Sequence, residues 1–146
     1  MGVDVFGRRA SSEAGEYFCN NFSWWHPLAE YCCEIAPAIT KHCKLWHSND
    51  GDGLNAAQSL ALADRIEAEL ATGRAHLYAR AHHVRDEVPC RICKSTGAMR
   101  APVGMVECLV CGGTGYAAAN TFNPFTVENL REFVAFLRGC GGFEIW

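Results

Sequence analysis

Four cysteines have the type and spacing of a single metal site. Cys90 and Cys93 form one Cys-x-x-Cys pair, Cys108 and Cys111 form another, and fourteen residues separate the two pairs. Each pair can present two thiolate sulfurs from one tight turn, and the residues between the pairs are enough for a hairpin that brings the turns together. Because Zn²⁺ prefers four sulfurs in a tetrahedral arrangement, we predict a zinc site with these four ligands. A redox dithiol, an iron–sulfur cluster and unmetallated thiols are the alternatives.

A site of four cysteines favours a structural role for the metal. Four protein ligands complete the coordination sphere of zinc and leave no position for an activated water. An enzyme would need a metal with an open position or an activated thiol, for which Cys19 and Cys140 are candidates that lack a recognisable third group. We therefore expect a protein that is not an enzyme.

The residues after each cysteine pair resemble a known repeat. Residues 108–115 match Cys-x-x-Cys-x-Gly-x-Gly, the repeat of the cysteine-rich region of DnaJ-type cochaperones, and residues 90–97 match it except that Ser95 replaces the first glycine. The resemblance covers residues 89–116, with two repeats where those cochaperones carry four, and the chain has no His-Pro-Asp tripeptide of a J domain. The resemblance implies a zinc knuckle at 89–116 and does not imply chaperone activity.

A second resemblance extends over the whole chain. Residues 2–7, 24–28, 49–54 and 136–145 look similar to segments of uncharacterised small proteins of bacteria and their phages. No activity and no functional residue comes with this group. The resemblance implies a phage or prophage setting, in which small proteins act by binding and blocking host machinery.

Composition is that of an ordinary globular protein. The chain has 146 residues, of which 49% are hydrophobic and 20% are charged, so we predict one domain over residues 1–146 with the knuckle at 89–116 as an insertion. No stretch approaches the roughly 18 apolar residues of a membrane span. The amino terminus lacks a signal peptide, and the odd count of nine cysteines argues against a disulfide scaffold. We expect a cytoplasmic location.

A basic segment leads into the knuckle. Residues 74–100 contain six basic and two acidic residues, whereas the whole chain has a net charge of −3. Such a segment could contact nucleic-acid phosphates or an acidic protein surface, or it could dock on the acidic part of its own chain. The candidate contacts are Arg80, Arg85, Arg91, Lys94 and Arg100. We favour a protein partner and keep nucleic acid as the alternative.

Hydrophobic patterning predicts a mostly helical α+β domain with short strands at both termini. Residues 3–6 alternate with period two and would pair with a strand at 143–146, while residues 8–22 form a connection. The predicted helices cover residues 27–35, 55–72, 74–86 and 127–138. Asn55 and Gln58 form the capping box of the second, and Thr126 caps the last.

Each of these helices has an apolar face, which on the first would carry Leu28, Tyr31 or Cys32, and Ile35. The residues expected on these faces are Leu60, Ala63, Ile66 and Leu70 for the second helix, Leu77, Ala81 and Val84 for the third, and Leu130, Phe133, Val134 and Leu137 for the last. Trp24 and Trp25 would either join the core or, if exposed, anchor a partner.

Further candidate sites have a simpler explanation each. Residues 48–53 resemble the start of a calcium loop, but Ser59 stands where an EF-hand needs a carboxylate, so we favour a plain loop. Pro89 and the following cysteines match half of a zinc deaminase signature, whose His-x-Glu half is missing. A second metal site remains an alternative to buried thiols for Cys32, Cys33, His42, Cys43 and His47.

Overall fold

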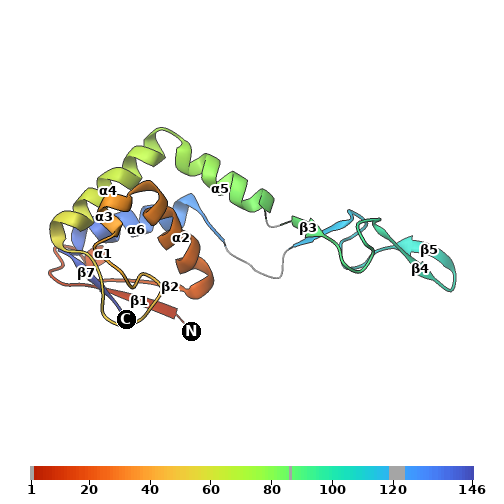
Figure 1. Cartoon of the computed structure of the whole chain (residues 1–146), viewed down its shortest axis with the longest axis horizontal. Coiled ribbons are helices and arrows are strands. Elements are labelled where there is room, and N and C mark those ends of the chain that lie inside the picture. Colours follow the sequence, from red (N-terminus) through yellow and green to blue (C-terminus); the bar gives the residue numbers. More distant parts are fainter. Residues whose placement is uncertain (1, 86, 119–123) are drawn as a thin grey trace. The chain divides into compact units, whose positions relative to one another are not determined.

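The computed structural model describes the backbone of residues 2–85, 87–118 and 124–146, and the side chains of the same residues except 83–85, 87 and 118. The chain forms two compact units (Figure 1). The first unit comprises Met1–Arg80 and Asn123–Trp146, and the second comprises Ala81–Phe122. The fold class is α+β, as predicted from the sequence. The predicted knuckle segment, 89–116, lies within the second unit.

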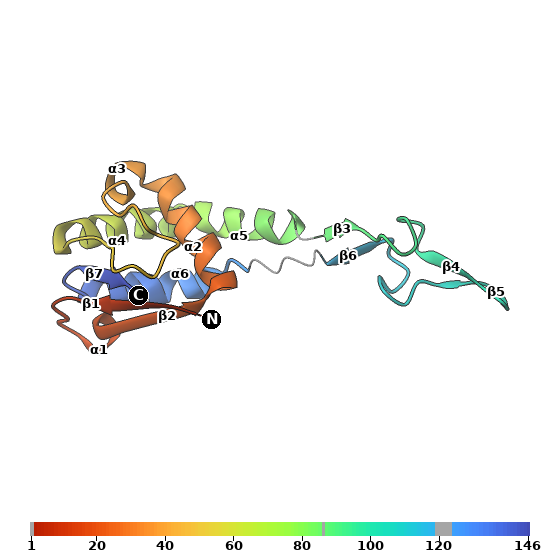
Figure 2. The ribbon, with the colours of Figure 1, turned by 60° about the horizontal axis from the view of Figure 1, so that its bottom comes forward.

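A three-stranded antiparallel sheet joins the two ends of the chain in the first unit. Strand β1 (Gly2–Gly7) lies between β2 (Tyr17–Asn21) and β7 (Phe143–Ile145) (Figure 2). Val5 is opposite Ile145 in the register, and both side chains are fully buried. The predicted pairing of the two termini is confirmed.

The segment predicted as a connection, residues 8–22, contains regular structure. Helix α1 (Glu13–Glu16) is capped by the Ser12 side chain, and β2 then pairs with β1 over its whole length. Phe18 is the one residue of β2 that is buried. A single inward side chain gives no period-two pattern, which is why the sequence did not reveal this strand.

Helix α2 (Phe22–Ile35) begins five residues earlier than predicted. The Asn21 side chain accepts a hydrogen bond from the Trp24 backbone N–H and caps the helix, so Pro27 lies inside it. Proline removes one intrahelical hydrogen bond, and the burial of Trp25 and Leu28 on either side offsets that loss. The short helix α3 (Pro37–Thr40) follows.

Three further helices contribute to the structure. Helix α4 (Ala56–Ala71) begins with the predicted capping box, α5 covers Arg74–Arg85, and α6 (Val127–Gly139) begins at the predicted Thr126 cap. All four core residues predicted for α6 are buried. None of the described helices is long and apolar enough to cross a membrane.

The predicted apolar faces of α4 and α5 are partly wrong. Leu60 is 43% exposed, and Leu62 takes its place in the core. On α5, Leu77 is 64% exposed, whereas Ala75 is buried. Both helices carry apolar residues at two overlapping helical spacings, and tertiary packing selects between them.

The second unit consists of two small antiparallel ladders. Strand β3 (Glu87–Pro89) pairs with β6 (Tyr116–Ala118), and β4 (Ala98–Ala101) forms a hairpin with β5 (Gly104–Glu107). The cysteine pairs occupy the turns that connect the two ladders. Among the described residues of the second unit, the buried hydrophobic cluster is made of Cys90, Cys93 and Cys108, so these residues form almost no apolar core.

We predict that Gly15→Ala destabilises the first unit. A Cβ atom at Gly15 would overlap the backbone carbonyl of Gly139, and backbone cannot move aside cheaply, so we expect a loss of about 1–3 kcal/mol. Urea unfolding followed by tryptophan fluorescence measures the first unit alone, because all four tryptophans lie in it. Gly2→Ala is the control, since its nearest neighbour would be 3.4 Å away. Equal unfolding midpoints for the two variants would contradict the prediction.

Candidate metal centre

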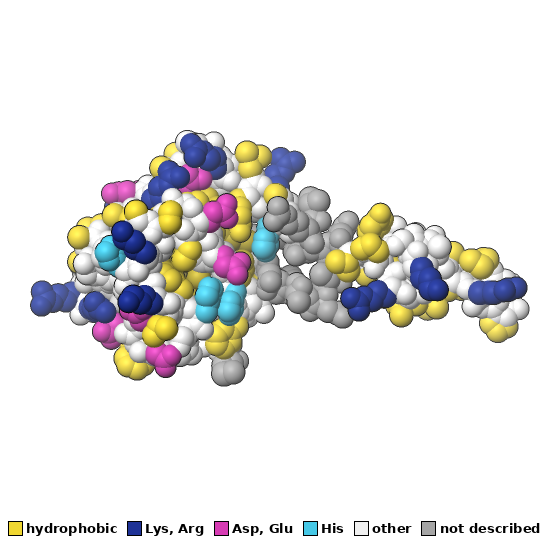
Figure 3. Space-filling model, in the orientation of Figure 1, with side chains coloured by type: hydrophobic (Ala, Val, Ile, Leu, Met, Phe, Trp, Pro, Cys, Tyr) yellow, Lys and Arg dark blue, Asp and Glu magenta, His cyan; other side chains and the backbone are white. Residues whose placement is uncertain are grey.

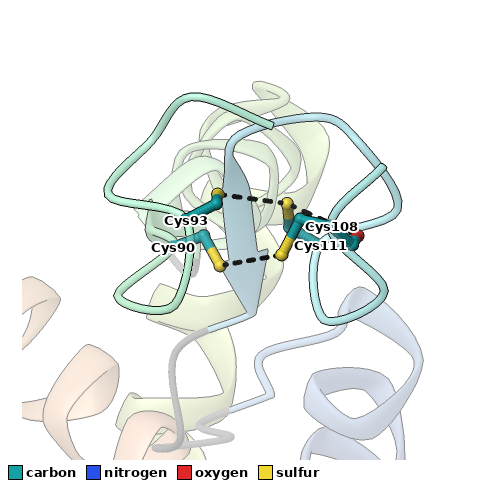
Figure 4. Close-up of side chains that lie close together, drawn as sticks. All are labelled: Cys90, Cys93, Cys108 and Cys111. Carbon is teal, nitrogen blue, oxygen red and sulfur yellow. Dashed lines mark hydrogen bonds between the residues drawn. The ribbon is translucent and has the colours of Figure 1, made fainter. Parts of the chain in front are cut away.

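The four predicted cysteine ligands lie together in the second unit (Figure 4). Their sulfur atoms all lie within 4.8 Å of one another. The Cys90 and Cys108 sulfurs are 3.9 Å apart, and those of Cys93 and Cys111 are 3.7 Å apart. Sulfurs bound at about 2.3 Å to one tetrahedral ion lie about 3.8 Å from each other. The separations therefore suit a metal ion such as zinc and are far longer than the roughly 2.05 Å of a disulfide.

The two cysteine turns have the same backbone conformation. Lys94 and Ser95 have φ values of 51° and 68°, and the equivalent Gly112 and Gly113 have φ values of 57° and 78°. Ser95, the residue that departs from the glycine pattern, thus adopts the left-handed conformation that the pattern requires.

Backbone hydrogen bonds tie each turn to the metal position and to the other turn. The N–H groups of Gly97 and Gly115 each donate to a cysteine sulfur at 3.3 Å, in Cys93 and Cys111 respectively. The N–H of Cys90 donates to the Gly115 carbonyl and that of Cys108 to the Gly97 carbonyl, both at 2.9 Å. Amides that donate to sulfur stabilise thiolates and orient them as ligands.

Gly97 and Gly115 also permit the two turns to approach closely. A Cβ atom at Gly97 would overlap the Gly113 carbonyl, and one at Gly115 would overlap the Ser95 carbonyl. The glycines of the repeat therefore have a packing role as well as a conformational one.

Electrostatics in the cluster already favour ionisation of one thiol. Burial opposes ionisation of Cys93, but the Gly97 N–H and the neighbouring sulfurs lower its pKa to about 7. The Cys108 pKa is raised: backbone hydrogen bonds at Cys111 favour its thiolate, and burial and the nearby cysteines outweigh them. A divalent cation at the centre would stabilise all four thiolates together, because a coordinated thiol loses its proton.

The predicted basic contact residues are divided between the two units. Arg91, Lys94 and Arg100 are exposed on the second unit, and Arg80 is exposed on α5. The Arg85 side chain lies outside the described residues.

Arg74, another member of the basic segment, contacts the acidic part of its own chain. It lies 3.4 Å from the buried carboxylate of Glu69, which Arg65 also contacts at 2.8 Å. Arg74 therefore fits the alternative that the basic segment docks on the acidic part of its own chain.

The two adjacent tryptophans have different environments. Trp25 is fully buried, donates a hydrogen bond from Nε1 to the Trp46 carbonyl at 2.6 Å and packs edge-on against Phe133. Trp24 is half-buried. Of the two alternatives that the sequence left open, core residue or partner anchor, Trp25 is therefore a core residue.

The candidate calcium loop is a hydrogen-bonded turn. The Asp52 carboxylate accepts from the backbone N–H groups of Lys44 and Leu45 at 2.6 and 3.0 Å. These bonds use the carboxylate to hold the loop, in agreement with the simpler interpretation from the sequence.

The cysteines proposed for a second metal site do not form one with their predicted partners. Cys32 and Cys43 are buried, and burial raises the pKa of Cys43 to about 12. Within the described part of the chain, His47 instead meets His26 and Glu30. The sequence offered only one sign of this grouping, which is that His26 and Glu30 are four residues apart on one helix.

No family model, no curated protein and no solved structure matches this chain. The four-cysteine cluster thus identifies a metal-binding arrangement and leaves the family open.

We predict that Cys93→Ser and Cys108→Ser each abolish metal binding at the four-cysteine site and the hydrogen-exchange protection of residues 89–116. A structural zinc contributes on the order of 10 kcal/mol of apparent binding free energy, and the second unit has little else to hold it. Cys19→Ser, which changes an exposed cysteine outside the cluster, is the control. Retained protection in a metal-free double variant would show that the fold of the second unit does not depend on the metal.

Proposed function

We propose that this protein is a zinc-stabilised, non-enzymatic module that binds another protein through the second unit. The zinc holds the two cysteine turns in place, and side chains that project from the turns and the adjoining strands contact the partner. The sequence resemblance to phage proteins further suggests that the partner is a host protein whose activity is blocked.

The exposure of large hydrophobic side chains on the second unit is the observation that supports this proposal most directly. Eight of the fourteen exposed large hydrophobic residues among those described lie in this unit, although it is much the smaller of the two. Leu109 and Val103 are 93% and 89% exposed. The most exposed members, here called the apolar knuckle residues, are Ile92, Val103, Met105, Leu109, Val110 and Tyr116.

Metal binding does not explain these apolar residues. Ile92, Leu109 and Val110 occupy middle positions of the Cys-x-x-Cys turns and are exposed, and the polar Arg91 at another of these positions shows that the turn does not require an apolar residue. Exposed apolar side chains that gather on one small unit are typical of an interaction surface.

Several features favour a role without catalysis. Four sulfurs would leave no open position on a tetrahedral ion. Cys140, one of the two candidate nucleophiles, is buried, and its pKa is raised by that burial. A thiol in such surroundings stays protonated and unreactive near neutral pH.

Charge indicates the kind of surface that the partner presents. Among the described side chains of the second unit, three are basic (Arg91, Lys94 and Arg100) and one is acidic (Glu107). Basic and hydrophobic side chains lie close together on the face of this unit seen in Figure 3. A partner with an apolar patch rimmed by acidic residues would complement it. The same three cations favour nucleic acid as the second candidate.

We predict that Leu109→Ser/Val110→Ser reduces capture of the partner at least tenfold, because burying a leucine or valine side chain contributes about 1.5–3 kcal/mol and about 1.4 kcal/mol is a tenfold change in affinity. The measurement is affinity capture from host-cell lysate with nuclease treatment and at two salt concentrations, with zinc content determined for each variant. Leu77→Ser, which removes an exposed leucine from the first unit, is the matched control.

The same experiment tests nucleic-acid binding. If the captured material is nucleic acid, leaves at moderate salt and requires Arg91 and Arg100, the basic residues are the functional surface. That outcome would contradict protein binding. A discrete protein that resists nuclease and is lost only from the Leu109→Ser/Val110→Ser variant would support it.

A further inference from the structure

A second group of metal-binding side chains lies in the first unit. His26, Glu30 and His47 each offer one ligand atom, and these atoms all lie within 4.8 Å of one another. The three residues belong to a different compact unit from the four cysteines. They also differ in kind, because two imidazoles and a carboxylate replace four thiolates.

Local structure brings the three side chains to one place. His26 and Glu30 are four residues apart on α2 and so lie one above the other on the same face of the helix. His47 comes from the loop after α3. His26 is half-buried, and the other two side chains are exposed and therefore accessible to an ion.

The loop that carries His47 is fixed to the core. Trp46, its neighbour, is 5% exposed and donates from Nε1 to the Thr40 carbonyl at 3.1 Å. The Trp46 carbonyl in turn accepts a hydrogen bond from Trp25, the residue before His26 on α2. The same pair of buried tryptophans thus fixes the backbone positions of both histidines. Metal sites depend on a rigid backbone of this kind to position their ligand side chains.

The two imidazoles lie face to face. Their ring centroids are 4.4 Å apart and their planes differ by 5°, while Phe22 packs at 5.7 Å from His26. Burial and the neighbouring His26 lower the pKa of His47, and Glu30 partly opposes this.

We propose that His26, Glu30 and His47 form a second metal site, which binds zinc or another divalent cation of similar ligand preference. Imidazole nitrogen with one carboxylate oxygen suits Zn²⁺, Ni²⁺ and Cu²⁺ better than Mg²⁺ or Ca²⁺. Ligand atoms around a tetrahedral ion at about 2.1 Å lie about 3.4 Å apart. A metal binds an imidazole nitrogen in the plane of the ring, so the exposed His47 ring must rotate out of its parallel stack with His26 for both nitrogens to face one ion. Rotation of the exposed Glu30 side chain supplies the remaining contraction.

The second site differs from the cysteine site in being open. Three protein ligands leave a fourth position to a water molecule or to a donor group from another molecule. The chain would then carry one buried, closed metal and one surface metal that exchanges its outer ligand.

The test measures the number of zinc ions bound per chain as total zinc is increased. A competing chelator buffers the free zinc concentration. We expect two ions for the wild type and one for His47→Ala, and at least tenfold weaker binding of the second ion to Glu30→Gln. His42→Ala, which changes an exposed histidine outside the group, should still bind two. Cys93→Ser/Cys108→Ser should keep the open site, because that site lies in the other unit.

Cobalt gives an independent readout. Cobalt bound to the cysteines shows sulfur-to-metal charge-transfer absorption, whereas the ion held by His26, Glu30 and His47 should show none. A wild type that saturates at one ion would overturn the proposal. Equal affinity for the second ion in wild type and His47→Ala would also overturn it. So would a loss of the second ion in His42→Ala as large as that in His47→Ala.

Discussion

The antiparallel pairing of β1 with β7 is the constraint on which the rest of the structure depends. By joining residues near the two ends of the chain, it closes the first unit and allows the chain to leave that unit after Arg80 and re-enter it at Asn123. The second unit is therefore built from a segment whose two ends are anchored in an already stable domain. Closing such a loop costs entropy that grows only slowly with its length, so the small unit needs few interactions of its own, and a metal can supply most of them.

The two units are stabilised by different chemistry. The first has a core of aromatic rings in which Phe133 contacts Trp25, Phe136 and Phe143. The second has a cluster of thiols in place of a core and leaves its large apolar side chains in solvent. Those side chains are available for an interaction because the thiol cluster, and not their burial, determines the fold of the unit. The division also separates the proposed partner surface from the proposed open metal site, so each can be altered alone.

Features that follow a local rule could be predicted from the sequence. Each Cys-x-x-Cys turn, the Asn55 capping box and the apolar face of α6 depend on residues a few positions apart, and all were predicted. The period-two pattern near each end of the chain also predicted one long-range feature, the pairing of β1 with β7. Other features that long-range packing decides were not predicted. Strand β2 carries one buried side chain, Leu62 and not Leu60 faces the core, and α2 begins before its proline because Asn21 caps it. His26 and His47 come together because buried tryptophans hold a loop against a helix, and no recognisable motif links these two histidines in the sequence.

The two cysteine turns have the same backbone structure but carry different side chains. The backbone angles and hydrogen bonds of residues 90–97 recur at 108–115. The variable positions do not repeat: one turn presents Arg91 and Ile92, and the other presents Leu109 and Val110. A surface that docks on these turns meets the cation of Arg91 on one turn and the apolar side chain of Leu109 at the equivalent position of the other. Near-symmetry of the backbone would allow two orientations of a bound molecule, and this difference in polarity selects one of them.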